Sequence, residues 1–308
     1  MAEGVAVSIV VCTRNRASSL RQTLAALERT ERSADLPVEV IVVDNASTDA
    51  TREVVRTPLR YVGAPEPGVA RARNAGLSAA RGDVILFLDD DTRPPPRWIE
   101  PMCRPILRGD ADAVAGGVRV ASHLRRPWMR PLHLTWLAST EYIDRTTPQE
   151  MVSANMAFGR HVLARVPGFD AELGPGALGQ GEDALFSWQL LRAGFRIAPA
   201  LDVAVEHHFE PSRLLRPSFR ETAHRRGHTL AYQRHHWEHV ELPDANRRFR
   251  RKLVRLALLR VRRWRECLAS EGMPEWEMLA LENLAFLRRW TVERARPRRY
   301  DRFGLVAR

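Results

Sequence analysis

The chain has 308 residues, of which 44% are hydrophobic and 28% are charged, as is typical of a globular protein in water. Its three cysteines are odd in number and far apart, which argues against a disulfide framework and favours a reducing compartment. No apolar run approaches the roughly 20 residues that cross a bilayer, and no signal-peptide pattern opens the chain. We therefore expect a cytoplasmic protein, either free or bound peripherally at the inner membrane face.

The net charge of +11 is unevenly distributed along the chain. Residues 1–215 carry 25 Lys and Arg against 26 Asp and Glu, a net −1, whereas residues 216–308 carry 23 against 11, a net +12. This asymmetry predicts two regions with different roles. The basic region either contacts an anionic partner, such as a membrane surface, or forms a helical subdomain with solvated arginines. Nucleic acid is the less favoured partner.

The first part of the chain alternates between strand and helix patterns. Ser19 and Gln22 resemble a capping box at the start of the first helix, and Gly82 follows the third helix in a position typical of a C-terminal cap. Strands are expected at 7–11, 38–43, 59–62 and 84–88, and helices at 19–27, 49–55 and 69–81.

This alternation is typical of a mostly parallel sheet with helices on both faces, a Rossmann-like α/β fold. In such sheets ligands bind beyond the carboxyl ends of the strands. Thr13, Asp44 and Asp89 each stand at such an end. We therefore expect these three side chains to meet at one crevice.

Three acids, Asp89, Asp90 and Asp91, directly follow the apolar run at 84–88. Adjacent carboxylates repel one another, so they favour a bound cation, and hard oxygen ligands suit Mg²⁺ or Mn²⁺. The alternative is a solvated acidic turn, because short acidic motifs often match by chance.

Beyond the acids the pattern is less regular. A glycine-rich loop occupies 174–181, and Glu182 opens an apolar helix that Gly194 ends. An extended segment leads to His207 and His208. Further helices are expected at 97–107, 216–237, 246–270 and 275–296, further strands at 113–120, 152–158 and 197–205, and irregular structure at 122–149.

Four segments together resemble the inverting nucleotide-sugar glycosyltransferases of family 2, which have the GT-A fold. They are 7–16, 40–51, 68–92 and 181–194, in the order found in that family. The resemblance covers about two thirds of the chain and leaves 216–308 outside it. It implies a catalytic domain over 1–215, followed by a basic helical region that contacts an acceptor, a membrane surface or another subunit.

The resemblance implies a donor site for a nucleoside-diphosphate sugar, with UDP as the expected nucleotide. In similar enzymes the aspartate corresponding to Asp44 meets the uracil ring, and the arginine corresponding to Arg73 lies near the nucleotide. Asp44 could instead make only a turn, and Arg73 could lie on a solvated helix face. The expected nucleotide-sugar-binding residues are Thr13, Arg14, Asp44, Asn45, Arg73, Asn74, Asp89 and Asp90.

By the same resemblance, Asp91 binds the metal and Asp89 faces the ribose or the metal, while the role of Asp90 is the least defined. His207 is expected as a further metal ligand, since His207 and His208 point to opposite faces of a strand and only one can face inward. A structural histidine is the alternative. Five histidines lack a zinc pattern, so we interpret them as surface or acceptor-side residues: His224, His228, His235, His236 and His239.

Glu182 and Asp183 correspond to the acidic pair of the family. The resemblance implies that Asp183 is the general base that deprotonates an acceptor hydroxyl, and that Glu182 binds or orients the acceptor. Both acids could instead only complement the dipole of the helix that they begin. We expect the glycines at 179 and 181 to let this helix start close to a ligand.

The sequence thus predicts a metal-dependent inverting glycosyltransferase. A sugar-phosphate nucleotidylyltransferase shares the α/β layout, but it needs a glycine-rich loop near the N-terminus, and the segment 13–16 contains no glycine. The non-enzymatic alternative is a basic protein that binds nucleic acid or a membrane surface through 216–308.

Overall fold

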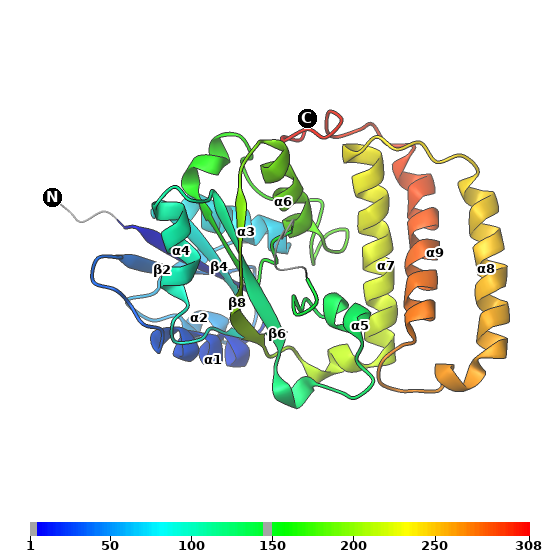
Figure 1. Cartoon of the computed structure of the whole chain (residues 1–308), viewed down its shortest axis with the longest axis horizontal. Coiled ribbons are helices and arrows are strands. Elements are labelled where there is room, and N and C mark those ends of the chain that lie inside the picture. Colours follow the sequence, from blue (N-terminus) through cyan, green and yellow to red (C-terminus); the bar gives the residue numbers. More distant parts are fainter. Residues whose placement is uncertain (1–4, 144–149) are drawn as a thin grey trace.

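The computed structural model describes residues 5–143 and 150–308. Within them, an eight-stranded mixed sheet has the order β3-β2-β1-β4-β7-β6-β8-β5. Three long helices stand beside the sheet at one end of the molecule (Figure 1). The strands are β1 Val7–Thr13, β2 Val38–Asp44, β3 Arg60–Gly63, β4 Val84–Asp89, β5 Thr92–Arg93, β6 Ala113–Val120, β7 Asn155–Gly159 and β8 Ile197–His207. The α-helices are α1 Ala17–Glu28, α2 Thr51–Val54, α3 Val69–Ala79, α4 Ile99–Leu107, α5 Pro131–Trp136, α6 Glu182–Arg192, α7 Arg216–Tyr232, α8 Ala245–Arg262 and α9 Glu275–Glu293.

Strands β3, β2, β1 and β4 are parallel neighbours, whereas β7 pairs antiparallel with β4. In this register Thr13 lies opposite Asp44, and Cys12 lies opposite Asp89. The polar strand ends therefore share one edge of the sheet, as the sequence predicts. The mostly parallel α/β fold with a C-terminal helical region is confirmed.

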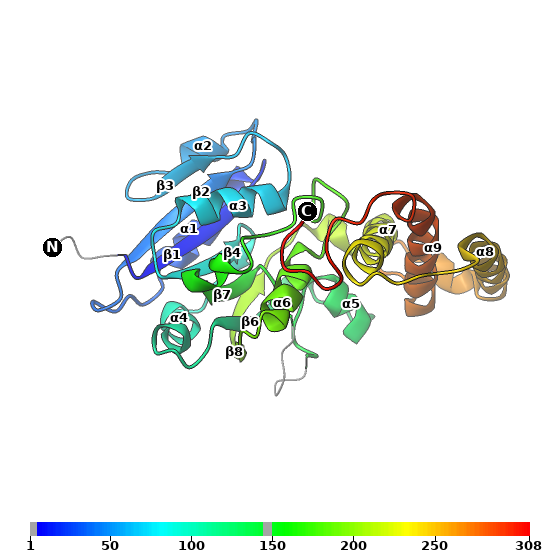
Figure 2. The ribbon, with the colours of Figure 1, turned by 90° about the horizontal axis from the view of Figure 1, so that it is seen from above.

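Helices cover both faces of the sheet because successive strand residues point to opposite sides. Val7, Ile9 and Val11 of β1 belong to the hydrophobic cluster that includes α1 and α4. Val10 and Phe87 belong to the cluster that includes α3 and α6. Figure 2 shows the sheet and its helices from above, with α7, α9 and α8 in a row beyond the sheet.

The three helices predicted for the basic region are present, with α9 between α7 and α8 (Figure 1). The first continues as a π-helix over Gln233–Trp237, and the second is followed by a 3₁₀ turn over Trp264–Cys267. No helix in the described residues combines the length and apolar character needed to cross a membrane. The stretch predicted to be irregular, 122–149, contains the short helix α5, and its residues 144–149 lie outside the described part.

The predicted capping box is wrong. Helix α1 begins at Ala17, and Ser19 donates its hydroxyl to the backbone oxygen of Asp90 at 3.0 Å. The Ala17 N–H instead reaches the carboxylate of Asp49 at 3.1 Å. A distant acid thus provides the acceptor that a local side chain was expected to supply.

Two further predictions from local pattern are wrong. Helix α3 ends at Ala79, before Gly82 could cap it, and Gly82 instead packs against the backbone of β1. His235 and His236 are buried and not on the surface, and the His236 Nε2 lies 2.8 Å from the Glu293 carboxylate. Tertiary packing of α7 against α9 buries these imidazoles.

Candidate active site

A cavity of about 400 Å³ opens at the carboxyl ends of β1 and β4, where the start of α6 and the end of β8 also meet. Its volume is in the range of small-molecule sites. Two predicted site residues, Asp44 and Asn74, do not line it. The predicted residues that do are Thr13, Arg14, Asn45, Arg73, Asp89, Asp90, Asp91, Glu182, Asp183 and His207.

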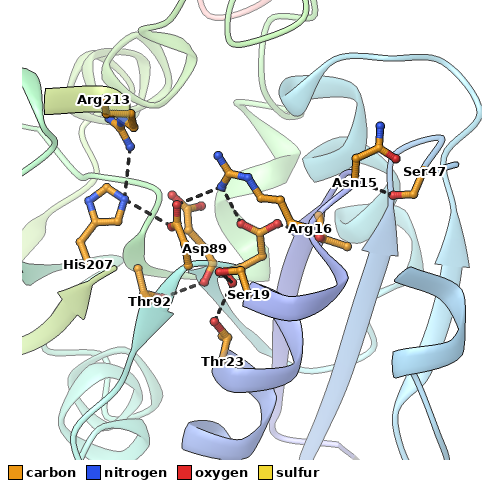
Figure 3. Close-up of polar contacts among 12 residues, drawn as sticks. Asn15, Arg16, Ser19, Thr23, Ser47, Asp89, Thr92, His207 and Arg213 are labelled. Carbon is orange, nitrogen blue, oxygen red and sulfur yellow. Dashed lines mark hydrogen bonds and ion pairs between the residues drawn. The ribbon is translucent and has the colours of Figure 1, made fainter. Parts of the chain in front are cut away.

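The carboxylates of Asp90 and Asp91 contact the side chains of Thr13, Arg16 and His207. Asp90 accepts a hydrogen bond from the Thr13 hydroxyl at 2.7 Å and one from Arg16 at 2.9 Å. The same Arg16 nitrogen lies 2.9 Å from Asp91, and His207 Nε2 lies 3.3 Å from the other Asp91 oxygen. In Figure 3 Arg16 and His207 lie on opposite sides of Asp89.

Because of these contacts, the pKa values of the three acids shift in different directions. Burial raises the pKa of Asp90 despite Arg16, and it raises the pKa of Asp89 despite Arg73. Burial also acts on Asp91, but His207 and Arg16 together lower its pKa below the usual range. Asp91 is therefore the acid of the three that the protein holds most firmly as a carboxylate.

Arg73 joins the acidic triplet to the start of α6. Its guanidinium pairs with the Glu182 carboxylate and lies 3.5 Å from Asp89. Arg73 and Glu182 are both buried, and the second Glu182 oxygen has no hydrogen-bond partner among the described residues. Burial and the neighbouring Asp183 raise the pKa of Glu182 to about 7, although Arg73 opposes the shift.

Asp183 is less buried than Glu182 and lines the cavity. Its two oxygens accept the backbone N–H groups of Ser153 at 3.1 Å and Ala184 at 2.9 Å. Each carboxylate oxygen has two lone pairs, so each keeps one for another donor. The backbone therefore orients the carboxylate and leaves each oxygen able to accept one further hydrogen bond.

The glycine-rich loop before α6 is shaped by α7. A Cβ on Gly181, whose φ is +85°, would lie 2.7 Å from Thr229 Cγ2, and one on Gly179 would lie 2.8 Å from the Arg225 carbonyl oxygen. Thr229 also donates its hydroxyl to the Gln180 carbonyl at 2.6 Å. The two glycines therefore permit a close approach of the loop to α7, and the expectation that they let α6 start close to a ligand stays a prediction.

Three predicted nucleotide contacts have protein partners. Asp44 accepts hydrogen bonds from the Ser47 N–H and the Tyr61 hydroxyl, both at 2.9 Å. The Asn45 amide holds the segment 64–68 through three hydrogen bonds. The Asn74 amide exchanges hydrogen bonds with the Phe169 backbone at 2.8 Å each, outside the cavity.

Two arginines that line the cavity were not predicted from the sequence as site residues. Arg16 bridges Asp90 and Asp91, and Arg213 lies 3.4 Å from His207 Nε2. Arg16 is the last residue of the polar segment 13–16 at a strand end, so its position in the sequence pointed to the site. Arg213 lies beyond the four segments that resemble the family, and its position gave no such indication. Cys12 also lines the cavity, but burial raises its pKa to about 12, as expected of a residue that is not a nucleophile.

The side chains in the cavity that could ligate a metal fit a hard divalent cation. Asp89 and Asp91 offer carboxylate oxygens, and a third of the Asp89 side chain is exposed. His207 Nδ1 lies 3.1 Å from the Leu137 carbonyl, so Nδ1 carries a hydrogen and orients the ring, and Nε2 lies 3.3 Å from an Asp91 oxygen. The described residues contain no cluster of three such side chains already arranged as a metal site, and Arg16 balances the acids.

Comparison with solved structures shows which class of fold this is. The chain is similar to the mannosyltransferase PcManGT from Pyrobaculum calidifontis, solved with GDP-Man and Mn²⁺, with a TM-score of 0.56 and 20% identity over 96% of this chain and 74% of that one. A mycobacterial protein gives a TM-score of 0.51 at 24% identity, covering 74% of each chain. These likenesses establish the GT-A fold.

Residues 8–165, more than half of the chain, match the profile of Glycosyl transferase family 2, and the chain belongs to that family of nucleotide-sugar glycosyltransferases. It is 34% identical over 119 residues to the hyaluronan synthase of Pasteurella multocida, covering 36% of this chain and 12% of that protein. It is 28% identical over 221 residues to the pre-mycofactocin glycosyltransferase of Mycobacterium tuberculosis, covering 65% of this chain and 43% of that protein. The chain thus spans less than half the length of either relative.

Proposed function

We propose that this chain transfers a sugar from a nucleoside-diphosphate sugar to an acceptor hydroxyl with inversion at the anomeric carbon. The observation that carries the proposal is the convergence of Arg73, the three acids 89–91 and Asp183 on one cavity. The proposed donor is a UDP-sugar. GDP-mannose, which is bound to the structural relative PcManGT, is the comparison donor.

In this proposal Asp183 is the general base. Its carboxylate takes the proton of the acceptor hydroxyl as that oxygen attacks the anomeric carbon and the diphosphate leaves. Backbone N–H groups hold both of its oxygens, which keeps the carboxylate oriented toward one side of the cavity. Glu182 orients the acceptor through the carboxylate oxygen that has no protein partner in the described residues.

The donor's phosphates are the proposed partners of the cationic groups. Arg16 and Arg213 line the cavity next to Asp91 and His207, and a guanidinium suits phosphate oxygens. Asp91, Asp89 and His207 would hold a Mn²⁺ or Mg²⁺ ion together with these oxygens. When bound, the ion would neutralise charge on the departing diphosphate. Thr13 and Arg14, which line the cavity, are proposed to face the nucleoside.

The division into a catalytic domain, 1–215, and a basic helical region, 216–308, is also a proposal. Thr229 and Gln233 of the second region hydrogen-bond to residues 180 and 181 of the first. Tyr232 and Tyr300 both donate to Asp170 at 2.6 Å. These contacts support a helical region that holds the loop before α6 in place and does not move as a separate unit.

The test is a panel of UDP-sugars and GDP-mannose, with and without Mn²⁺, in which thermal stability and release of nucleoside diphosphate are measured. A donor that binds only the native state raises the melting temperature. We expect shifts with one nucleotide family that require the metal. If no nucleotide sugar shifts the melting temperature and none is cleaved, the proposal is wrong.

A further inference from the structure

The outermost helix, α8, is strongly cationic. It contains eight Arg and Lys residues and no Asp or Glu. Arg260 pairs with Glu277 of α9. Among the described residues no ion pair involves the remaining basic side chains of α8, which are Arg247, Arg248, Arg250, Arg251, Lys252, Arg255 and Arg262. Their charge is therefore available to a partner.

Apolar side chains on α8 are exposed beside this charge. Leu253, Ala257 and Val261 follow one another at four-residue spacing, and Val254 and Leu258 form the adjacent row, so they share one face. Leu258 is 66% exposed and Val261 is 76% exposed. We call these five residues the apolar stripe.

The stripe continues into the turn after the helix. Trp264 and Leu268 are 55% and 71% exposed. In contrast, Leu256, beside the stripe, is buried in the cluster that contains α9 residues. Helix α8 thus has one apolar side for the protein and a second apolar side that the described residues leave uncovered.

A hollow of about 530 Å³ lies at the start of α8. Four arginines line it, and Asp244 is the one acid among its lining residues. Arg250 precedes Leu253 and Val254 by three and four positions, which places it on the same face as the apolar stripe. The lining residues are Asp244, Ala245, Asn246, Arg247, Arg250, Arg251 and Arg294.

We propose that α8 binds the surface of a membrane that contains anionic phospholipids. The apolar stripe, with Trp264 and Leu268, enters the boundary between headgroups and acyl chains, and the hollow at 244–251 receives lipid phosphates. A helix with a basic polar face and an aliphatic and aromatic opposite face is typical of helices that lie in this plane. The proposal goes beyond the sugar-transfer function and does not depend on it.

Charge and shape favour a membrane over other partners. A second copy of this chain would bring two acid-free cationic helices together, and that contact is repulsive. The phosphate backbone of a nucleic acid would match the arginines but would leave the aliphatic stripe uncovered. An anionic bilayer matches both the charge and the apolar side chains.

Co-sedimentation with vesicles tests the proposal on the full chain. We expect binding to phosphatidylcholine vesicles that contain phosphatidylglycerol, and little binding to phosphatidylcholine alone. The triple variant R247Q/R250Q/R251Q should lower the partition coefficient roughly a hundredfold, because each cation near an anionic surface contributes about fivefold. The variant L258S/V261S should lower it about tenfold while leaving the charge unchanged.

Each variant has a matched control. The control for charge is R21Q/R32Q/R56Q, three exposed arginines of the first region, and the control for apolar exposure is L279S/V292S on α9. Both controls should bind vesicles like the unaltered chain, and circular dichroism should show the same helix content for all variants.

Several results would overturn the proposal. One is equal binding to both kinds of vesicle, or to neither. Another is vesicle binding by L258S/V261S that matches the unaltered chain. If the unaltered chain does not bind vesicles but self-associates, and L258S/V261S abolishes the self-association, the partner is a second copy of the chain. Binding to RNA without binding to vesicles would identify the basic face as a nucleic-acid surface.

Discussion

The Arg73 guanidinium and the Glu182 carboxylate form a buried ion pair that joins α3 to the first turn of α6. The pair connects the acidic triplet, where Arg73 also approaches Asp89, to the helix that carries Asp183. Because neither charge is exposed, each depends on the other for compensation.

Replacing Glu182 with Ala should lower the free energy of unfolding by about 3–5 kcal/mol, because it leaves a buried guanidinium with Asp89 alone. Glu182→Gln keeps the shape and should cost less. Urea unfolding measures both values. The control is Glu100→Ala, which removes an exposed pair with Arg104 and should cost less than about 1 kcal/mol. Equal losses at the two sites would contradict a buried pair of this kind.

Asp183→Asn should reduce sugar transfer by roughly 10²–10⁴-fold, because an amide cannot take the proton of the acceptor hydroxyl. Donor binding, measured as a thermal shift with the nucleotide, should persist. Glu275→Gln, which changes an acid in the first turn of α9, serves as the control and should leave the rate unchanged. Near-normal turnover of Asp183→Asn would eliminate the proposed base.

Asp91→Asn should abolish the thermal shift caused by Mn²⁺ together with the nucleotide, since it removes the carboxylate that the protein keeps ionised. A chelator should have the same effect on the unaltered chain. Asp35→Asn changes an exposed acid far from the cavity lining and should retain the shift. If the shift survives in Asp91→Asn, the metal binds elsewhere or is not needed.

The pair of Glu293 with His236 should make the C-terminal helices sensitive to acid. Burial opposes ionisation of Glu293, but the His236 hydrogen bond and Arg289 outweigh it and lower its pKa to about 2. A folded-state pKa below the unfolded one adds stability above the unfolded value, and this stability disappears as the pH falls through the folded value. The contribution should therefore be present above a pH of about 4.5 and decline toward about 2.

Urea midpoints measured across that range test the prediction. The unaltered chain should lose roughly 2–3 kcal/mol from this group. Glu293→Gln should be less stable at neutral pH but should lose less on acidification. A parallel decline of the two proteins would show that other carboxyl groups cause the acid sensitivity.

Gly76→Ala should destabilise the contact between α3 and β1. The added Cβ would lie 2.5 Å from Val10 Cγ1, which is too close without movement of the buried strand. Overpacking of this kind costs about 1–3 kcal/mol. Gly63→Ala, whose Cβ would meet Tyr61 at 3.8 Å, is the matched control and should be nearly neutral in thermal unfolding. A neutral Gly76→Ala would mean that α3 can shift on the sheet.

Much of the fold could be predicted because its signals are local. The β-branched run at 7–11 and the apolar run at 84–88 became β1 and β4, since side-chain alternation and buried length follow directly from residue type. The prediction of a capping box at Ser19 was wrong because the contact that replaces it is not local. A distant acid, Asp49, satisfied the helix start, and no local pattern contains that information.

The candidate site was predictable to the extent that strand ends share an edge. Parallel pairing alone brings Thr13, Asp44 and Asp89 together. The orientation of each side chain was not predictable. Asn74 stands one position from Arg73, yet its amide holds the Phe169 backbone outside the cavity while Arg73 pairs with Glu182 inside it.

The sequence by itself determined the family, the alternation of strands and helices, and the edge of the sheet where polar residues gather, because these depend on residue types and spacings along the chain. Only the tertiary structure decided the partners of the charged groups. Thr13 reaches Asp90 across 77 positions, and Arg73 reaches Glu182 across 109. Such contacts depend on how β4, α6 and β8 pack, and packing decides which neighbouring acid is neutralised and which is left facing the cavity.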